Sequence, residues 1–309
     1  MRVAVLTTGK MEWHGLHLAL ERLFPGQHFY RVPTEAEVSS SADDYPYPGF
    51  TSVALNAGHV SDPPEALLDL IERAAREALQ TRDGGGADHV VVVDDVELCN
   101  LGQEAQVVEV VRAGVQRYLD DRPAACERIA EALRSRVSFH LARPMIEAWL
   151  FADPAALARA GVANGEAATL PLEHDPEAFS TSDPAYLAAT DASCPCWVED
   201  GRKAKTRPKW LGAGPREQHP KGYLQWLCVD GARPNCTHYS ESDVGADALR
   251  ELGWGLVLSR PEGQLAYLRA LLADLAASLD QAPSTGAVAS VGAATAAQPT
   301  GGHRLLRNL

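Results

Sequence analysis

Residues 89–95 read His89-Val90-Val91-Val92-Val93-Asp94-Asp95, and this stretch decides the fold. Four consecutive valines have no polar alternation, which is typical of a central parallel strand that is covered on both faces. The two aspartates mark the carboxyl end of that strand. Because parallel strands need long crossover connections, we expect helices between this strand and its neighbours. The stretch therefore predicts an α/β protein.

Strand and helix signals alternate on both sides of the valine run. Short apolar stretches predict further strands at 2–7, 27–32 and 137–141. Apolar residues at helical spacing predict helices, which in chain order span 12–24, 64–79, 103–119, 145–152, 155–160 and 263–279. Alternation of this kind predicts a mostly parallel sheet flanked by helices.

The same patterns divide the chain into four parts. Residues 1–165 are predicted to form the α/β domain, and 166–245 form an irregular subdomain rich in Cys, Trp, Pro and basic residues. Residues 246–281 form a helical segment that packs back on the core. Residues 282–309 are mostly small, so their burial cannot offset the entropy lost on ordering. We expect a flexible tail there, within which 303–309 can dock as a short peptide although nothing in the sequence demands it.

Charge and composition limit the classes of function. The chain has 28 Lys and Arg against 41 Asp and Glu, which gives a formal charge of −13. A protein that coats DNA or an anionic membrane is normally basic, so both roles are disfavoured. No apolar run approaches the roughly 20 residues that cross a bilayer, and six cysteines in 309 residues do not make a disulfide framework. We expect a soluble cytoplasmic protein with no membrane partner.

Acidic residues gather where the predicted strands end, which is where reactive groups lie in open α/β sheets. Carboxylates that are brought together repel each other unless a cation joins them, and hard oxygen ligands favour Mg²⁺ or Mn²⁺. Such an ion can activate water and neutralise charge on a phosphodiester. The candidate metal ligands are Glu12, Asp94, Asp95, Glu97, Glu147 and Asp153.

Each of these acids also has a structural alternative. Asp94 and Asp95 can form a solvated turn or cap the helix that follows. Asp153 precedes Pro154, which makes it a good helix N-cap. Glu147 lies in an otherwise apolar stretch, where an isolated charge is very costly, so it must be paired or bind a ligand. Arg143 is the partner that a purely structural role would use.

The stretch 143–153, RPMIEAWLFAD, resembles the IE-x-WLLAD motif of an uncharacterised group of bacterial TOPRIM-like proteins related to the OLD (overcoming lysogenisation defect) nucleases. Three further pieces match in order. Gly9-x-x-Glu12 resembles the EG-x-TE turn of that group, 89–97 resembles its strand that ends in D-x-D, and 219–224, HPKGYL, resembles its HPKxYL segment. The resemblance covers roughly residues 1–275.

The resemblance implies a TOPRIM-like sheet and Mg²⁺-dependent hydrolysis of phosphodiester bonds in DNA or RNA, with Glu12 and Glu147 as catalytic residues. It also implies an antiviral defence role with an ATPase partner, and a homodimer. The chain departs from the pattern at Thr8, where TOPRIM enzymes carry Glu, and either Asp95-x-Glu97 or Asp94 supplies the acidic pair. Two alternatives therefore stand beside the nuclease: a catalytically weakened binding or regulatory subunit, which Thr8 favours, and a metal-dependent nucleotide phosphohydrolase.

A basic segment stands out against the acidic total. Residues 201–221 carry seven Lys and Arg and a single acid, Glu217, and aromatic residues accompany them. Basic side chains neutralise phosphates while aromatic rings stack on unpaired bases, so the segment predicts a nucleic-acid groove. The alternative is a solvated loop that compensates acidic neighbours. The candidate nucleic-acid contacts are Arg202, Lys203, Lys205, Arg207, Lys209 and Lys221.

Cysteine pairs flank the basic segment. Cys194 and Cys196 on one side, with Cys236 and His238 on the other, are chemically able to hold a structural Zn²⁺ tetrahedrally. Cys228 is a fifth candidate. The spacing within each pair is one residue, tighter than the two to four that zinc sites usually have. The alternative is ordinary, partly buried thiols.

Overall fold

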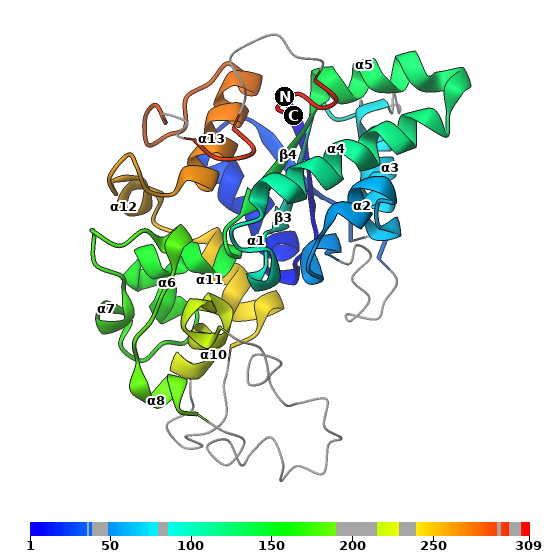
Figure 1. Cartoon of the computed structure of the whole chain (residues 1–309). Helices are drawn as coiled ribbons and strands as arrows, with labels where there is room; N and C mark the ends of the chain where they lie inside the picture. Colours follow the sequence, from blue (N-terminus) through cyan, green and yellow to red (C-terminus); the bar gives the residue numbers. More distant parts are fainter. Residues whose placement is uncertain are drawn as a thin grey trace.

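The computed structural model describes residues 1–35, 37–38, 49–79, 86–189, 215–228, 239–288, 292–296 and 304–309. Four parallel strands form one sheet in the order β2-β1-β3-β4 (Figure 1). The strands are β1 (Arg2–Thr7), β2 (His28–Val32), β3 (His89–Asp95) and β4 (Val137–Ala142). The predicted α/β class with a parallel sheet is confirmed, and the valine strand β3 is internal and buried along its whole length.

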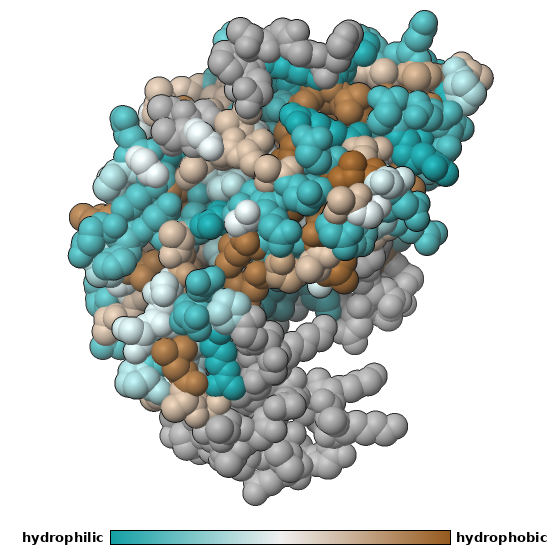
Figure 2. All heavy atoms as spheres, viewed as in Figure 1, coloured by the Kyte–Doolittle hydropathy of each residue, from teal (hydrophilic) through white to brown (hydrophobic). Residues whose placement is uncertain are grey.

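Helices cover both faces of the sheet (Figure 1). The apolar stripes of these helices supply the two hydrophobic cores, one on each side of the sheet. On the surface that Figure 2 shows, hydrophilic residues dominate and apolar residues lie in separate patches. One face is covered by α1 (Lys10–Leu23) and α13 (Ala266–Leu279), and the other by α3 (Glu65–Leu79), α4 (Glu104–Asp120) and α5 (Cys126–Arg136).

Shorter elements complete the chain. The stretch 145–152, predicted as an α-helix, contains a 3₁₀ helix, η4 (Ile146–Ala152). The helix α5 is not among the predicted helices, because its charged sequence has only four residues that become buried. Within the described residues, no helix has both the length and the apolar character to cross a membrane. The short α-helices of the described part of the chain are α2 (Ala57–Ser61), α6 (Pro154–Arg159), α7 (Gly165–Ala168), α8 (Pro184–Leu187), α10 (Pro220–Leu227), α11 (Ala246–Arg250) and α12 (Trp254–Leu258). The short 3₁₀ or π helices are η1 (Phe50–Ser52), η2 (Leu98–Asn100), η3 (Pro123–Ala125), η5 (Pro176–Ala178), η9 (Arg216–Gln218) and η10 (Glu241–Gly245).

Successive residues of β3 face opposite sides of the sheet, as a strand requires. Val91 and Val93 lie in the core under α1 and α13, whereas Val90 and Val92 lie in the core under α3, α4 and α5. Extending this alternation to the end of the strand sends Asp95 to the α1 side and Asp94 to the α3 side.

The last six residues pack against β4, so within the stretch predicted as a flexible tail this peptide takes the docked alternative that the sequence left open for 303–309. The side chain of Asn308 donates to the carbonyl of Phe139 at 2.7 Å and accepts from its amide at 3.0 Å. The amide of Arg307 donates to the carbonyl of Val137 at 2.8 Å. Since β4 is an edge strand, these bonds occupy backbone groups that would otherwise be open to pairing.

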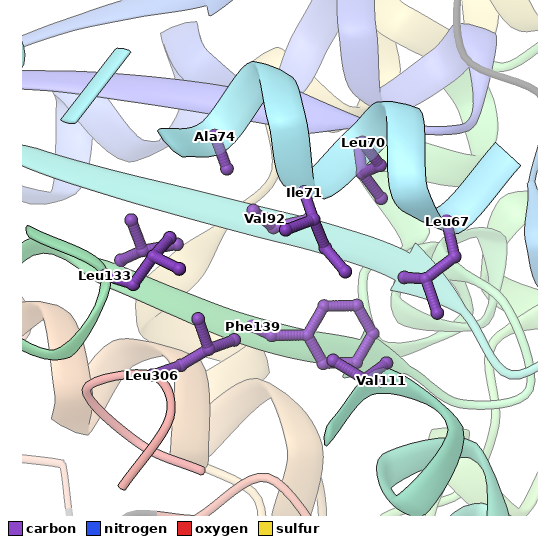
Figure 3. A pocket seen from close by; sticks show the side chains of 10 residues that line it. Leu67, Leu70, Ile71, Ala74, Val92, Val111, Leu133, Phe139 and Leu306 are labelled. Atoms are coloured by element: carbon purple, nitrogen blue, oxygen red, sulfur yellow. The ribbon is translucent and has the colours of Figure 1, made fainter. Parts of the chain in front are cut away.

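Leu306 of this peptide reaches into a small apolar gap between the sheet and the helices (Figure 3). Ile71 and Leu67 of α3 point into the gap from one side, and Phe139 of β4 closes it from the other. The C-terminal peptide therefore contributes to the core as well as to the sheet edge.

The buried side chain of Asp274, in α13, connects the C-terminal peptide to the sheet. Asp274 accepts from His140 Nε2 at 3.3 Å and from Arg307 Nε at 3.3 Å, and its carboxylate lies 3.8 Å from His89 Nε2. Although burial opposes it, the contact with His140 holds the pKa of Asp274 well below its usual range. Burial lowers the pKa of His89 to about 4, while the charge of Asp274 opposes that change.

His89 makes the stability of the protein depend on pH. The pKa of His89 is about 4 in the folded chain and 6.5 when unperturbed, so the unfolded chain takes up the proton first as pH falls. The contribution of His89 therefore lowers the free energy of unfolding as pH falls below about 6.5, by ~2 kcal/mol at pH 5. We expect His89→Gln to lack this loss, so urea unfolding at pH 7 and pH 5 should show a smaller pH effect in the variant. An identical pH effect in both proteins would contradict the assignment.

Candidate functional site

Three buried carboxylates meet at the carboxyl edge of the sheet, on the α1 side. Glu12 comes from the first turn of α1, Asp95 from the end of β3, and Glu147 from η4 after β4. All three are buried. The charges of Glu12 and Glu147 raise the pKa of Asp95, and the charge of Glu147 also raises the pKa of Glu12. The sheet therefore collects acids that lie 83 and 52 residues apart in the chain, as the strand-end pattern predicts. We call these three residues the carboxylate cluster.

Glu12 owes its position to a glycine. The helix α1 begins after Gly9, and the Glu12 side chain folds back over this residue, where a Cβ would collide with its carboxylate. Burial, together with the charge of Glu147, raises the pKa of Glu12 to about 8. A side chain at position 9 would thus displace the Glu12 carboxylate from this place.

The two neighbouring aspartates have different surroundings. Asp95 Oδ1 accepts from the amide of Ile146 at 3.0 Å, which fixes the start of η4 to the end of β3. Burial and the charges of Glu12 and Glu147 raise the pKa of Asp95 well above its usual value. Asp94 instead accepts from the hydroxyls of Thr8 and Thr51, the latter at 3.1 Å. Of the alternatives that the sequence left open, Asp95 lies in the carboxylate cluster, whereas its predicted companion Glu97 and the alternative Asp94 do not.

Asp94 and Glu97 occupy the border of the site. Burial raises the pKa of Asp94 to about 7, against the opposing hydrogen bonds from Thr8 and Thr51. Glu97 is half-buried, and its charge contributes to the raised pKa values of both aspartates. Its backbone has a positive φ of 63° and donates to the carbonyl of Pro144 at 2.9 Å. This contact joins the β3 turn to the connection that carries Glu147.

Glu147 is the most buried member, at 1% exposure. Its Oε1 lies 3.2 Å from Lys221 Nζ and accepts from the hydroxyl of Tyr239 at 3.3 Å. Its Oε2 is buried and has no hydrogen-bond partner among the residues that the structure describes. Burial raises the pKa of Glu147, while Lys221 opposes the rise. One oxygen of this carboxylate is therefore buried without a donor from the described part of the chain.

Arg143 is not the partner of Glu147, which pairs with Lys221 instead. The Arg143 Nε donates to Glu104 at 2.7 Å, and the guanidinium also donates to the carbonyl of Glu177. Glu177 in turn accepts from the amides of Tyr267 and Leu268 at 2.8 Å each, at the start of α13. Arg143 thus stabilises the turn that caps α13, and Glu147 pairs with Lys221.

Lys221, the last basic residue of the segment that is predicted to form a groove leading to the acidic centre, lies at the carboxylate cluster. The HPKGYL segment forms the start of α10, with His219 as N-cap, accepting from the amide of Gly222 at 3.3 Å, and Pro220 in the first turn. The Lys221 side chain is 23% exposed and lies 3.6 Å from Glu241. Although burial opposes it, the charges of Glu147 and Glu241 raise the pKa of Lys221 well above its usual value.

Tyr239 and Glu241 belong to the site but were missed by the sequence analysis. The phenol of Tyr239 lies over Gly245, where a Cβ would stand 2.8 Å from its oxygen. Burial and the charge of Glu147 raise the pKa of Tyr239 well above its usual value. These residues lie just before α11, which packs on α1. No spacing in the sequence relates them to Glu147; only the helix packing does.

Asp153 is corrected from metal ligand to helix cap. Its Oδ1 accepts from the amide of Ala155 at 2.8 Å, and its Oδ2 accepts from Gly253 at 2.7 Å. One oxygen thus caps the N-terminus of α6, and the other binds the residue that precedes α12. This is the N-cap alternative that the following proline suggests.

The cysteine and basic candidates have mixed outcomes. Cys228 is buried and donates to the carbonyl of Ala160, and burial raises the pKa of its thiol to about 12, so it is a packed thiol. The other predicted contacts lie outside the described residues, namely Arg202, Lys203, Lys205, Arg207 and Lys209 for nucleic acid, and Cys194, Cys196, Cys236 and His238 for zinc.

The fold and the site define a class of protein: an α/β protein with a carboxylate cluster and one lysine at the carboxyl edge of a parallel sheet. Comparisons with family models, curated proteins and solved structures give no match for this chain. Among the described residues, no three His, Cys, Asp or Glu side chains already stand in position to share one metal ion. The functional argument therefore rests on the chemistry of the cluster.

Proposed function

We propose that this protein hydrolyses phosphodiester bonds of nucleic acid with Mg²⁺ or Mn²⁺, in a site of the TOPRIM-like kind. The observation that carries the proposal is the carboxylate cluster itself. Glu12, Asp95 and Glu147 are buried side by side at the edge of the sheet where reactive groups gather, and one oxygen of Glu147 has no donor among the described residues. Purely structural carboxylates would be expected to have their oxygens paired.

The donor set fits a hard divalent ion. Carboxylate oxygens are the ligands that Mg²⁺ and Mn²⁺ prefer, and Glu12, Asp95 and Glu147 would hold the ion. When bound, such an ion lowers the pKa of water and neutralises charge on a phosphodiester.

The other residues position the cluster. The amide of Ile146 orients Asp95, and the hydroxyl of Tyr239 orients Glu147. Lys221, whose side chain is 23% exposed, would supply a positive charge to a phosphate oxygen. The chain can thus hold an anionic substrate beside its own carboxylates.

Thr8 does not weaken the proposal. Its hydroxyl donates to Asp94, on the α3 side of the sheet, whereas Glu12 reaches the cluster from the next element. Glu12 therefore supplies the acid that the turn would otherwise carry at position 8. This arrangement favours an enzyme over the alternative of a catalytically weakened subunit.

The wider expectations remain part of this proposal. Residues Arg202 to Lys209 would lead the substrate to the cluster, and a structural Zn²⁺ at the flanking cysteines would hold that segment. From the resemblance, we further propose a role in antiviral defence with an ATPase partner, and assembly as a homodimer. Each of these rests on sequence alone.

The test is cleavage by the purified chain. We expect labelled DNA or RNA to be cut in Mg²⁺ or Mn²⁺, not in EDTA, with binding that weakens steeply as salt rises. Single-stranded DNA, duplex DNA, structured RNA and nucleoside triphosphates should be compared in parallel. Hydrolysis of the triphosphates alone would move the protein to the nucleotide phosphohydrolase class, and no hydrolysis of any substrate would overturn the proposal.

A further inference from the structure

The C-terminal peptide, residues 304–309, is held at the β4 edge by its own side chains. The side-chain amide of Asn308 bonds both backbone groups of Phe139, at 2.7 and 3.0 Å, as a neighbouring strand would. Leu306 enters the apolar gap beside Phe139 (Figure 3). Leu306 and Asn308 are buried, at 4% and 1% exposure. The β4 edge and the gap therefore form a site that selects a leucine and an asparagine two residues apart.

Arg307, between these two residues, adds charge to the recognition. Its amide donates to the carbonyl of Val137 at 2.8 Å, and its Nε lies 3.3 Å from the carboxylate of Asp274. Asp274 is buried, whereas the side chain of Arg307 is 29% exposed. The peptide thus brings a cation to a buried anion of α13.

Bonds within the peptide fix its shape. The amides of Leu305 and Leu306 both donate to the carbonyl of Leu309, at 2.8 and 3.1 Å. Arg304 Nη1 donates to the carbonyl of Arg307 at 3.3 Å. Since these bonds join residues 304–309 to one another, the peptide can dock in the same way when it comes from another chain.

The connection to the peptide is long enough to reach a second copy. The carbonyl of Thr295 accepts from the side chain of Asn308 at 2.9 Å, so the chain before the connection lies beside the peptide. Residues 297–303 follow, and their sequence, AQPTGGH, contains no large apolar residue. The eight steps from Ala296 to Arg304 span up to about 27 Å. This reach lets the peptide leave its own β4 edge for that of a copy beside it.

We infer that two copies of this chain join by exchanging their C-terminal peptides, each of which docks on β4 of the other. The contacts at the β4 edge are the same within one chain and between two, so the connection decides between them. It presents the peptide to its own site at an effective concentration on the order of 1 mM. Exchange therefore competes when the protein approaches ~1 mM. The inference is a route to the proposed homodimer and is independent of hydrolysis.

The first measurement is binding of the peptide in trans. A synthetic peptide of residues 304–309, with a fluorophore at its first residue, is titrated with the full chain that carries Leu306→Ala and Asn308→Ala. We expect one peptide to bind per chain. A peptide with Asn308→Ala should bind about tenfold more weakly, because two bonds to buried backbone groups are lost. Wild type, whose site is filled by its own peptide, should also bind about tenfold more weakly than the variant chain.

The second measurement is the oligomeric state of the full chain. Wild type and the double variant are unfolded in urea, refolded at about 10 µM and about 1 mM, and compared by light scattering at those concentrations. Wild type should be monomeric at the lower concentration and gain a dimer fraction at the higher one. The double variant should stay monomeric at both. Circular dichroism shows whether the double variant is folded, and Asn308→Ala alone replaces it if it is not.

The outcomes decide the inference without reference to cleavage. A folded variant chain that does not bind the peptide, or wild type that stays monomeric at ~1 mM, would overturn the exchange. A dimer that the variant forms equally well would also overturn it, because another surface would then join the copies. Since neither measurement involves nucleic acid or a metal ion, a failed exchange leaves the proposed hydrolysis standing, and a failed cleavage assay leaves the exchange standing.

Discussion

Glu147→Gln is expected to abolish metal-dependent cleavage while leaving the protein folded. Glutamine keeps the size of the side chain and can still accept from Tyr239, but it loses the charge that would hold the ion. Loss of about 4 kcal/mol of charge stabilisation in the transition state lowers the rate by ~10³-fold. Single-turnover cleavage of a labelled strand, with the enzyme in excess of the strand, measures this loss directly.

The same change should remove stabilisation by the metal. An ion that binds only the folded chain raises the free energy of unfolding by about 2.7 kcal/mol at a concentration ~100-fold above its dissociation constant. Wild type should gain this increment with Mn²⁺ in a urea titration, and Glu147→Gln should not. The two readouts together separate a lost ligand from a misfolded protein.

Glu177→Gln is the matched control for this variant. Glu177 is also a buried glutamate, and burial raises its pKa to about 8, but it caps α13 and lies outside the carboxylate cluster. The variant should lose about 1 kcal/mol of stability through a weaker cap and retain both cleavage and the Mn²⁺ increment. Wild-type cleavage by Glu147→Gln, or equal losses in both variants, would contradict the role of Glu147.

The sheet was predictable because its signals are local. An unbroken valine run marks a strand buried on both faces, and acids at strand ends mark the edge where a site forms. Even the separation of Asp94 from Asp95 follows from the two-residue period of a strand. Glu147 could be selected from sequence because a carboxylate in an apolar stretch requires a partner.

The partner itself could not be predicted. Lys221 follows Glu147 by 74 residues and belongs to a segment whose positive charge predicts a surface groove. Tyr239 reaches the site only because α11 packs on α1. Contacts of this kind depend on how helices pack, which no spacing in the chain encodes.

The C-terminal peptide illustrates a different limit. Its sequence follows a stretch of small residues, and the composition alone predicts a tail that stays unfolded. The docking depends on Asn308, whose amide matches both backbone groups of Phe139, and on the apolar gap that receives Leu306. A sheet edge is required before either feature has a partner, so the sequence allows 303–309 to dock but does not show where.

Asp95→Asn and Asp94→Asn are expected to differ sharply, although the two residues are adjacent. An asparagine at 95 can still accept from the amide of Ile146, so the fold stands, but the cluster loses one of its three charges. Cleavage should fall by about 10³-fold and the Mn²⁺ increment should disappear, as for Glu147. An asparagine at 94 leaves the cluster intact and disturbs only the contacts with Thr8 and Thr51.

For Asp94→Asn we therefore expect cleavage within about tenfold of wild type and a loss of ~1 kcal/mol in stability from the weakened hydroxyl contacts. Cleavage rate, Mn²⁺ stoichiometry and urea unfolding should be measured on both variants under one set of conditions. Because successive side chains of a strand point to opposite faces, only one of the two aspartates can belong to the cluster. If Asp94→Asn were the inactive variant and Asp95→Asn the active one, the reaction centre would lie on the α3 side of the sheet, and the carboxylate cluster would not be the site of cleavage.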